Sequence, residues 1–214
     1  MARVKKKKKK VEPLRIAVLV SGAGSSLQNL IDRVRDRRLP GVEIAVAVSS
    51  RSTVEAVERA QGAEIPVEII RVKDFPETGA FSDQIALTLD IYAVDLVVQA
   101  GWLCYWRPPR RWFGKVINIH PALLPHYGGK GFYGRRVHEA VLDAGDAETG
   151  ATVHWVDEEY DHGEVITQEQ CAVGPEDTVE TLADRVQALE RELLPRVIAW
   201  IRDGRIKRPK NPPK

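Results

Sequence analysis

The segment Asn118-Ile119-His120-Pro121 carries the side chains best suited to chemistry. It ends the apolar run from Val116 to Ile119, which predicts a buried strand. Side chains two positions apart on a strand point to the same side, so Asn118 and His120 face one place. An amide donor and an imidazole aimed at one point can stabilise an oxyanion and move a proton. A lone strand-end histidine is often structural, and the neighbouring asparagine is what favours a catalytic role.

Asp161 is a third candidate, in the turn Asp161-His162-Gly163 of a loop that also holds Asp157, Glu158 and Glu159. An acid in a turn is usually only a turn residue. A carboxylate facing His120, however, would favour the charged imidazolium and raise the pKa of the ring. If the loop faces His120, Asp161 would orient the ring and keep its pKa high, but the sequence alone does not establish that the two side chains meet.

A glycine- and serine-rich loop, Ser21-Gly22-Ala23-Gly24-Ser25-Ser26, joins a predicted strand to a predicted helix. Such a loop suits a phosphate, because glycine lets the backbone approach a ligand and a helix N-terminus offers free N–H groups. Either serine is a good N-cap for the helix. Position 27 is Leu27, so the loop is not a dinucleotide fingerprint, and no Gly-Lys-Ser/Thr follows as in a P-loop. A tight turn that ends the strand is the alternative.

The remaining histidines and cysteines do not indicate a metal site or a disulfide framework. These residues lack the spacing of metal ligands, and no Cys-x-x-Cys is present. They are His126, His138, His154, His162, Cys104 and Cys171. The Gly-x-Ser-x-Gly motif of the hydrolase nucleophile elbow is absent from the sequence. We expect no metal.

The elements that must position these side chains alternate between strand and helix. Strands are predicted at 15–20, 42–48, 66–70, 94–99 and 116–119, with helices after Ser26, at 53–61, 78–92 and 136–144, and from about Asp177. This alternation predicts a mostly parallel, doubly wound, Rossmann-like α/β sheet. Residues 151–156 and 164–170 predict an antiparallel strand pair, which a long C-terminal helix follows.

Composition and charge narrow the function. The chain has 214 residues, and residues 1–10 and 205–214 contain twelve of its 32 Lys and Arg but none of its 30 acids. The body is therefore acidic and unsuited to nucleic acid. We expect a basic disordered tail at 1–13, one domain at 14–206 and a second basic tail at 207–214. Without a signal peptide, a membrane span or paired cysteines, a cytoplasmic monomer or homodimer with small-molecule substrates is expected.

Three segments together resemble the glycinamide ribonucleotide formyltransferase family of folate-dependent enzymes. They are Ile16 to Gln28, Asn118 to Pro125, and Gly150 to His154 followed by Asp161. The resemblance covers about residues 14–206 and implies a formyl transfer from 10-formyltetrahydrofolate to the amine of 5-phosphoribosylglycinamide in purine biosynthesis. Two related enzymes remain as alternatives. Formyltetrahydrofolate deformylase usually has a regulatory domain ahead of this one, and methionyl-tRNA formyltransferase normally has an added C-terminal domain.

The resemblance also implies roles for residues of this chain. The catalytic set would be Asn118, His120 and Asp161. The ribonucleotide and its phosphate would be bound by Gly24, Ser25, Ser26, Gln187, Ala188, Leu189 and Glu190. The folate would be bound by Leu103, Cys104, Tyr105, Trp106, Asn118, Asp157, Glu158, Glu159, Tyr160 and Asp161.

The chain also departs from the family pattern. Cys104 and Thr78 stand where relatives have folate-contacting arginines, and Ser26 replaces a common asparagine. The loop from Gly128 to Arg135 looks longer than usual. Lys130, Arg135 or Arg136 would then replace the missing positive charge near the folate glutamate tail.

Overall fold

The apolar run after Pro13 forms β1 (Leu14–Val20), whose last five residues are buried in the middle of a seven-stranded sheet. The computed structural model describes residues 12–209, so most of both predicted basic tails lies outside the described residues. β1 is buried because helices cover both faces of the sheet around it, as its continuous run of branched side chains predicts.

The strands follow the order β3-β2-β1-β4-β5-β6-β7. The other strands are β2 (Val42–Ser49), β3 (Val67–Ile69), β4 (Leu96–Gln99), β5 (Val116–His120), β6 (Glu148–Trp155) and β7 (Val165–Ala172). The first five strands of the chain pair in parallel, whereas β6 is antiparallel to β5 and β7 to β6. The predicted parallel sheet and its antiparallel C-terminal pair are confirmed.

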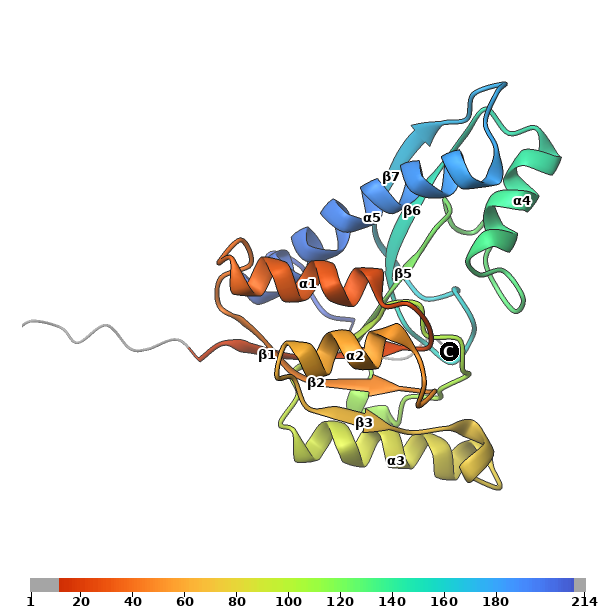
Figure 1. The fold of residues 1–214 in the computed structure, drawn as a ribbon. Coiled ribbons are helices and arrows are strands. Elements are labelled where there is room, and N and C mark those ends of the chain that lie inside the picture. The colour runs from red at the N-terminus through yellow and green to blue at the C-terminus, as the bar shows by residue number, and fades with distance from the viewer. Residues whose placement is uncertain (1–11, 210–214) are drawn as a thin grey trace, which may run out of the picture.

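Helices cover both faces of the sheet (Figure 1). They are α1 (Ser25–Arg35), α2 (Glu55–Gly62), α3 (Thr78–Ile91), α4 (Arg135–Ala144) and α5 (Val179–Arg202), with two 3₁₀ turns at Val72–Asp74 and Arg110–Trp112. Apolar side chains of α1, α2 and α5 pack in one core cluster with Ile16, Val18 and Val20. Those of α3 pack on the other face with Ala17 and Leu19. The alternation of β1 side chains between the two clusters is what a strand covered on both sides requires.

The long C-terminal helix begins at a capping box. The Thr178 hydroxyl accepts a hydrogen bond from the Thr181 amide, and the Thr181 hydroxyl accepts one from the Thr178 amide. These bonds satisfy donors at the helix start and fix where α5 enters the core. Within residues 12–209, no helix combines the length and the apolar character that a membrane crossing requires.

Candidate active site

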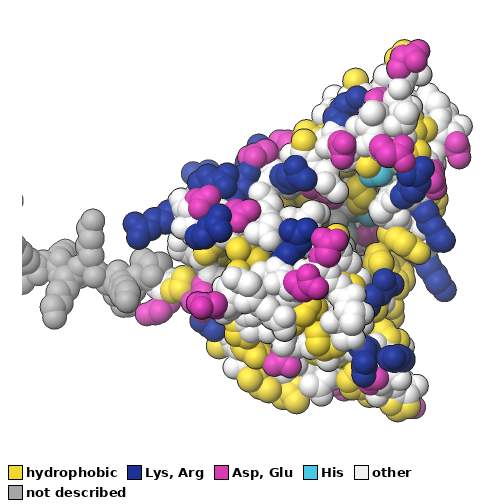
Figure 2. All heavy atoms as spheres, viewed as in Figure 1, with side chains coloured by type: hydrophobic (Ala, Val, Ile, Leu, Met, Phe, Trp, Pro, Cys, Tyr) yellow, Lys and Arg dark blue, Asp and Glu magenta, His cyan; other side chains and the backbone are white. Residues whose placement is uncertain are grey.

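The carboxyl ends of β1, β4 and β5 open into a cleft of about 630 Å³. This is the edge at which open α/β sheets bind ligands. Its walls come from the loops at 22–26, 99–106, 129–136 and 154–161 and from one side of α5. Figure 2 shows a hollow on this face, with histidine side chains visible inside it.

Gly24, not a serine, is the N-cap of α1, so the predicted serine N-cap is wrong. Gly24 has a φ of 73°, and its carbonyl accepts the first helical bond from the Gln28 amide at 2.9 Å. A Cβ there would lie 2.6 Å from the Ala56 Cβ, so the fold itself requires glycine at this position. Ser25 and Ser26 occupy the first two helical positions, and neither hydroxyl caps the helix. They line the cleft together with the N–H groups of the first turn.

Gly22 has a different role from Gly24. It also lines the cleft, but a Cβ built on it would meet nothing within 4 Å. The fold therefore leaves open space beside this glycine, so packing does not require glycine here as it does at position 24.

The buried hydroxyl of Ser21 joins two walls of the cleft. It accepts hydrogen bonds from the Ser50 hydroxyl at 2.7 Å and from the Leu103 amide at 2.9 Å. Ser21 thereby fixes the glycine loop at 21–26 relative to the loop at 103–106, which begins the predicted folate segment.

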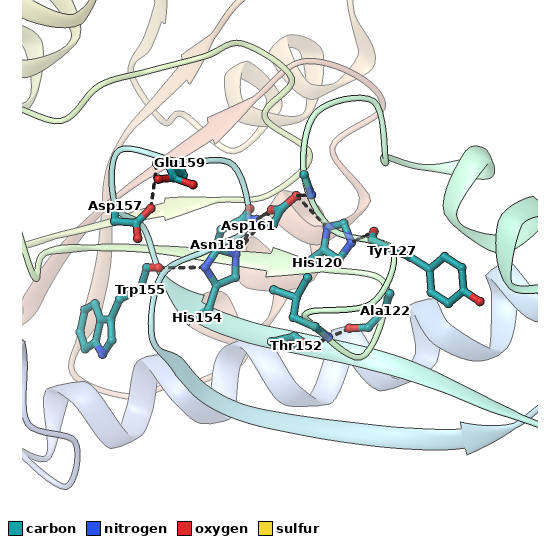
Figure 3. A network of polar contacts seen from close by, with 12 residues as sticks. Asn118, His120, Ala122, Tyr127, Thr152, His154, Trp155, Asp157, Glu159 and Asp161 are labelled. Carbon is teal, nitrogen blue, oxygen red and sulfur yellow. Dashed lines mark hydrogen bonds and ion pairs between the residues drawn. The ribbon is translucent and has the colours of Figure 1, made fainter. Parts of the chain in front are cut away.

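Four polar side chains meet at the centre of the cleft (Figure 3). The Asn118 amide nitrogen lies 3.1 Å from Asp161 Oδ1 and 3.1 Å from His154 Nε2. His120 Nδ1 lies 3.6 Å from Asp161 Oδ2, which is an ion-pair distance and too long for a direct hydrogen bond. Asp161 Oδ2 also accepts a hydrogen bond from the Gly129 amide at 3.0 Å. The structure thus brings the three predicted catalytic residues together and adds His154.

The partners of these side chains fix their orientations. His154 Nδ1 lies 2.8 Å from the Trp155 carbonyl, which can only accept, so Nδ1 carries the hydrogen and Nε2 accepts from Asn118. Asn118 then has one hydrogen for His154 and one for Asp161. The opposite amide orientation would set its oxygen against the Asp161 carboxylate.

Burial lowers the pKa of His120, contrary to the prediction of a raised pKa. The ring is only 4% exposed, and the cost of desolvating the imidazolium outweighs the attraction of Asp161 and the hydrogen bond to the Tyr127 carbonyl. For Asp161, burial alone would raise the pKa, but His154, His120 and the Gly129 amide lower it. The arrangement therefore favours a neutral imidazole beside an ionised carboxylate.

Two aromatic loops form the wall predicted to bind folate. The Tyr105 hydroxyl donates to the Glu158 carbonyl at 2.8 Å, the Tyr105 and Tyr160 rings lie 5.4 Å apart, and Arg107 pairs with the Glu158 carboxylate at 2.9 Å. All of the predicted folate residues line the cleft except Glu158, whose exposed carboxylate pairs with Arg107. Thr78 begins α3 and does not line the cleft.

One side of α5 closes the ribonucleotide end. Gln187 and Glu190 line the cleft, whereas Ala188 and Leu189 do not. Residues three apart share a helix face, and Leu189 turns instead to the core. Burial raises the pKa of Glu190 to about 7, and nearby Arg191 offsets this only in part.

Among the described residues, only two lysine or arginine side chains line the cleft, Lys130 and Arg136. Arg135 turns away and pairs with Glu139 at 2.7 Å and with Glu180. Arg136 lies over the Tyr133 ring, with 5.1 Å between the guanidinium carbon and the ring centre.

Sequence reasoning did not single out His154 or Tyr127 as site residues. His154 is the direct cross-strand partner of Asn118, which could be foreseen only by knowing the β5–β6 register. Tyr127 acts through its backbone carbonyl, which leaves no signal in residue type. Within residues 12–209, no group of three or more His, Cys, Asp or Glu is arranged to hold a metal ion.

Comparison with known proteins gives one consistent similarity. Residues 14–198 match the model of a family described as formyl transferase. A phosphoribosylglycinamide formyltransferase of Haemophilus influenzae is 37% identical over 195 residues, which is 90% of this chain and 89% of that protein. The trifunctional purine biosynthetic protein adenosine-3 of Bos taurus is 39% identical over 195 residues, and the chain spans only 19% of its length.

Solved structures agree with the sequence matches. The phosphoribosylglycinamide formyltransferase of Coxiella burnetii superposes with a TM-score of 0.83 at 38% identity, covering 94% of this chain and 92% of that one. The glycinamide ribonucleotide transformylase 1 of Symbiobacterium toebii gives a TM-score of 0.84 at 34% identity, with 92% of each chain covered.

Proposed function

The chain belongs to the formyl transferase family, and we propose that it transfers the formyl group of 10-formyltetrahydrofolate to the amine of 5-phosphoribosylglycinamide. One observation carries the proposal. A single cleft contains both a helix N-terminus suited to phosphate and the polar cluster of Asn118, His120 and Asp161. A small phosphorylated amine can thus be anchored at one end while its reacting nitrogen lies beside an acid–base group.

The cleft walls suit the two substrates at opposite ends. The first-turn N–H groups at Gly24, Ser25 and Ser26 would bind the phosphate, because they carry the positive end of the helix dipole. Gln187 and Glu190 on α5 would contact the rest of the ribonucleotide. The flat folate ring fits between the loops at 103–106 and 156–161, whose aromatic side chains and backbone line that part of the cleft.

We assign His120 the role of base. Bound 10-formyltetrahydrofolate supplies an activated formyl carbon, to which the substrate amine bonds. The amine nitrogen must then lose a proton, and the lowered pKa of His120 provides a neutral ring to take it. The imidazolium so formed at Nδ1 lies beside the Asp161 carboxylate. It returns the proton to the departing folate nitrogen as the carbon–nitrogen bond to folate breaks.

Asn118, oriented by Asp161, would stabilise the negative charge that develops on the formyl oxygen. Asp161 holds the Asn118 amide by one of its two N–H groups. The second N–H, which contacts His154 in this structure, is available to donate to that oxygen. An amide already oriented by its neighbours stabilises such charge without reorganising. The rest of the acceleration comes from holding two substrates in register.

Lys130 and Arg136 would provide the positive charge for the folate glutamate tail. They line the cleft, and no carboxylate pairs with either among the described residues. They replace the arginines expected at positions 104 and 78. Arg135 is excluded from this role because its guanidinium is paired outside the cleft.

The direct test is to incubate the protein with 10-formyltetrahydrofolate and to follow folate release with and without 5-phosphoribosylglycinamide. We expect release only when the ribonucleotide is present, with formylated ribonucleotide as product. Equal release without it would indicate a deformylase, and release only with methionyl-tRNA would indicate the tRNA enzyme.

A further inference from the structure

The backbone carbonyl of Tyr127 decides which nitrogen of His120 can take a proton. It lies 2.7 Å from His120 Nε2 and can only accept a hydrogen bond, so Nε2 carries the hydrogen. The nitrogen left with a lone pair is Nδ1, on the side of Asp161. In His154, the Trp155 carbonyl enforces the opposite tautomer, with the hydrogen on Nδ1.

Two contacts of the Tyr127 side chain hold its carbonyl in place, one with Asp146 outside the cleft and one with Phe132 at the cleft wall. The Tyr127 hydroxyl donates to Asp146 Oδ2 at 2.6 Å, and Asp146 directly follows Gly145, the C-cap of α4. The Tyr127 ring meets Phe132 edge-on at 6.2 Å. The backbone at Tyr127 has a φ of 56°, a conformation that a bulky residue keeps only when its surroundings impose it.

The rest of this segment is also fixed. We call residues 126–132 the strap. Gly128 packs so closely that a Cβ would lie 2.5 Å from Leu124 Cδ2. The Gly129 amide donates to Asp161 at 3.0 Å. The strap backbone therefore contacts both His120 and Asp161.

We propose that Tyr127 and Asp146, neither of which lines the cleft, are positioning residues that set the tautomer of His120 through the strap. Tyr127 presents the carbonyl, and Asp146 holds the Tyr127 side chain so that the carbonyl stays on Nε2. The effect on catalysis rests on the proposed function, whereas the effect on the tautomer does not.

Other charged groups around His120 do not replace this contact. Asp161 faces the ring from the 157–161 loop and favours its protonation, while His154 on β6 opposes it. His138 on α4 is a further close neighbour, and its own pKa is lowered by burial and by His120. Of these groups, none touches Nε2 among the described residues, so only the carbonyl determines where the neutral ring carries its hydrogen.

Nitrogen-15 NMR of the imidazole rings tests this directly. Spectra are recorded at about pH 8, where a histidine with a lowered pKa is neutral, and His120→Asn identifies the resonance. In the unmutated protein, His120 should be the Nε2–H tautomer and His154 the Nδ1–H tautomer. Tyr127→Phe and Asp146→Ala should convert His120 to a mixture of tautomers and leave His154 unchanged, as an internal reference.

Kinetics provide the second readout. Both variants should lower kcat by about 10- to 100-fold, the scale known for removing a group that orients a metal-binding histidine. KM for both substrates should change little. Asp146→Asn keeps an acceptor for the tyrosine hydroxyl and should restore most of kcat. Tyr127→Phe combined with Asp146→Ala should be no worse than either alone, because both act through one contact.

Tyr92→Phe is the matched control, because the Tyr92 hydroxyl also donates to a carboxylate, Glu68, at 2.8 Å but lies on α3's side of the sheet, away from the cleft. It should leave the His120 tautomer and kcat unchanged.

A His120 tautomer that persists in both Tyr127→Phe and Asp146→Ala overturns the proposal, whatever happens to kcat. A tautomer that changes with no effect on kcat supports the strap and refutes His120 as the base. An unmutated protein without formyl transfer but with the expected tautomers refutes the proposed function alone.

Discussion

Asn118 and Asp161 form the shortest contact that Asp161 makes with another predicted catalytic side chain, at 3.1 Å between Nδ2 and Oδ1. The carboxylate thus orients the asparagine amide by a hydrogen bond and acts on His120 at 3.6 Å mainly through its charge. Asp161 thus orients Asn118 and also shifts the pKa of His120. The first effect should be measurable in kcat and the second in the pH dependence of kcat.

Asp161→Asn should expose both effects. An amide at position 161 loses the charge and sets a second N–H donor against Asn118 or Gly129. We expect kcat to fall by ~10²–10³-fold with little change in either KM. Removing the carboxylate also lowers the pKa of His120, since Asp161 favours the charged ring. Because His120 must be neutral to act as base, the acidic limb of the kcat profile should move to lower pH. A limb that stays in place or moves to higher pH would contradict this assignment.

Gly22→Val tests the phosphate end without disturbing the fold. The new side chain has open space in the protein, and it adds bulk to a residue that lines the cleft next to the proposed phosphate site. Each lost charged hydrogen bond costs roughly 1.5–3 kcal/mol, so KM for the ribonucleotide should rise roughly 10- to 150-fold. The thermal unfolding midpoint should stay near that of the unmutated protein. Steady-state kinetics and calorimetry check the two parts.

Gly24→Ala provides the contrast. Its Cβ would overlap Ala56 and its φ of 73° is unfavourable for alanine, so we expect a loss of roughly 1–3 kcal/mol in the free energy of unfolding. Denaturant unfolding measures this. An alanine variant as stable as the original would show that the loop relaxes freely.

Lys130→Gln and Arg136→Gln should weaken the binding of polyglutamylated folate more than that of the monoglutamate. Both side chains are exposed at the cleft, so we expect an effect of roughly two- to fivefold on KM for the long form. Added salt should reduce the difference. Arg135→Gln is the matched control, because Arg135 neighbours Arg136 but is paired outside the cleft. Equal effects on both folate forms would refute a role at the glutamate tail.

Glu190→Gln should change how stability depends on pH. The pKa of Glu190 is about 7 in the folded chain against 4.5 ordinarily, so the folded state binds the proton more tightly than the unfolded state. This contribution is fully present below pH 4.5 and is lost as pH rises through about 7. At pH 8 the variant should therefore unfold at a higher temperature than the unmutated protein. At pH 4 it should not. KM for the ribonucleotide should rise in the same variant. Parallel melting curves at both pH values would contradict the shifted pKa.

The sheet could be predicted from the sequence because its signals are local. The apolar run of β1 and the regular alternation of strands and helices predict a mostly parallel sheet, although the strand pairing itself joins segments far apart in the sequence. The same holds for Asn118 and His120, since a spacing of two on a strand is enough to place both side chains in the cleft.

What the sequence did not reveal depends on contacts between distant segments. The N-cap at Gly24 follows from packing against Ala56, and the pKa of His120 from a balance between burial and Asp161. Neither the N-cap nor the pKa can be predicted from residue types, because both depend on contacts that exist only in the folded chain. The position of Ala188 and Leu189 outside the cleft, by contrast, follows from helical periodicity.

The pairing of Asn118 with His154 lies where the sheet changes from parallel to antiparallel, between β5 and β6. A shift of one residue in this pairing would turn one of the two side chains to the opposite face. A misregistered sheet could still bury its apolar residues in part, yet it could not assemble this centre. Recovered activity after refolding therefore indicates that β5 and β6 are paired in the correct register. Circular dichroism would not detect such a register error, because it reports only the content of secondary structure.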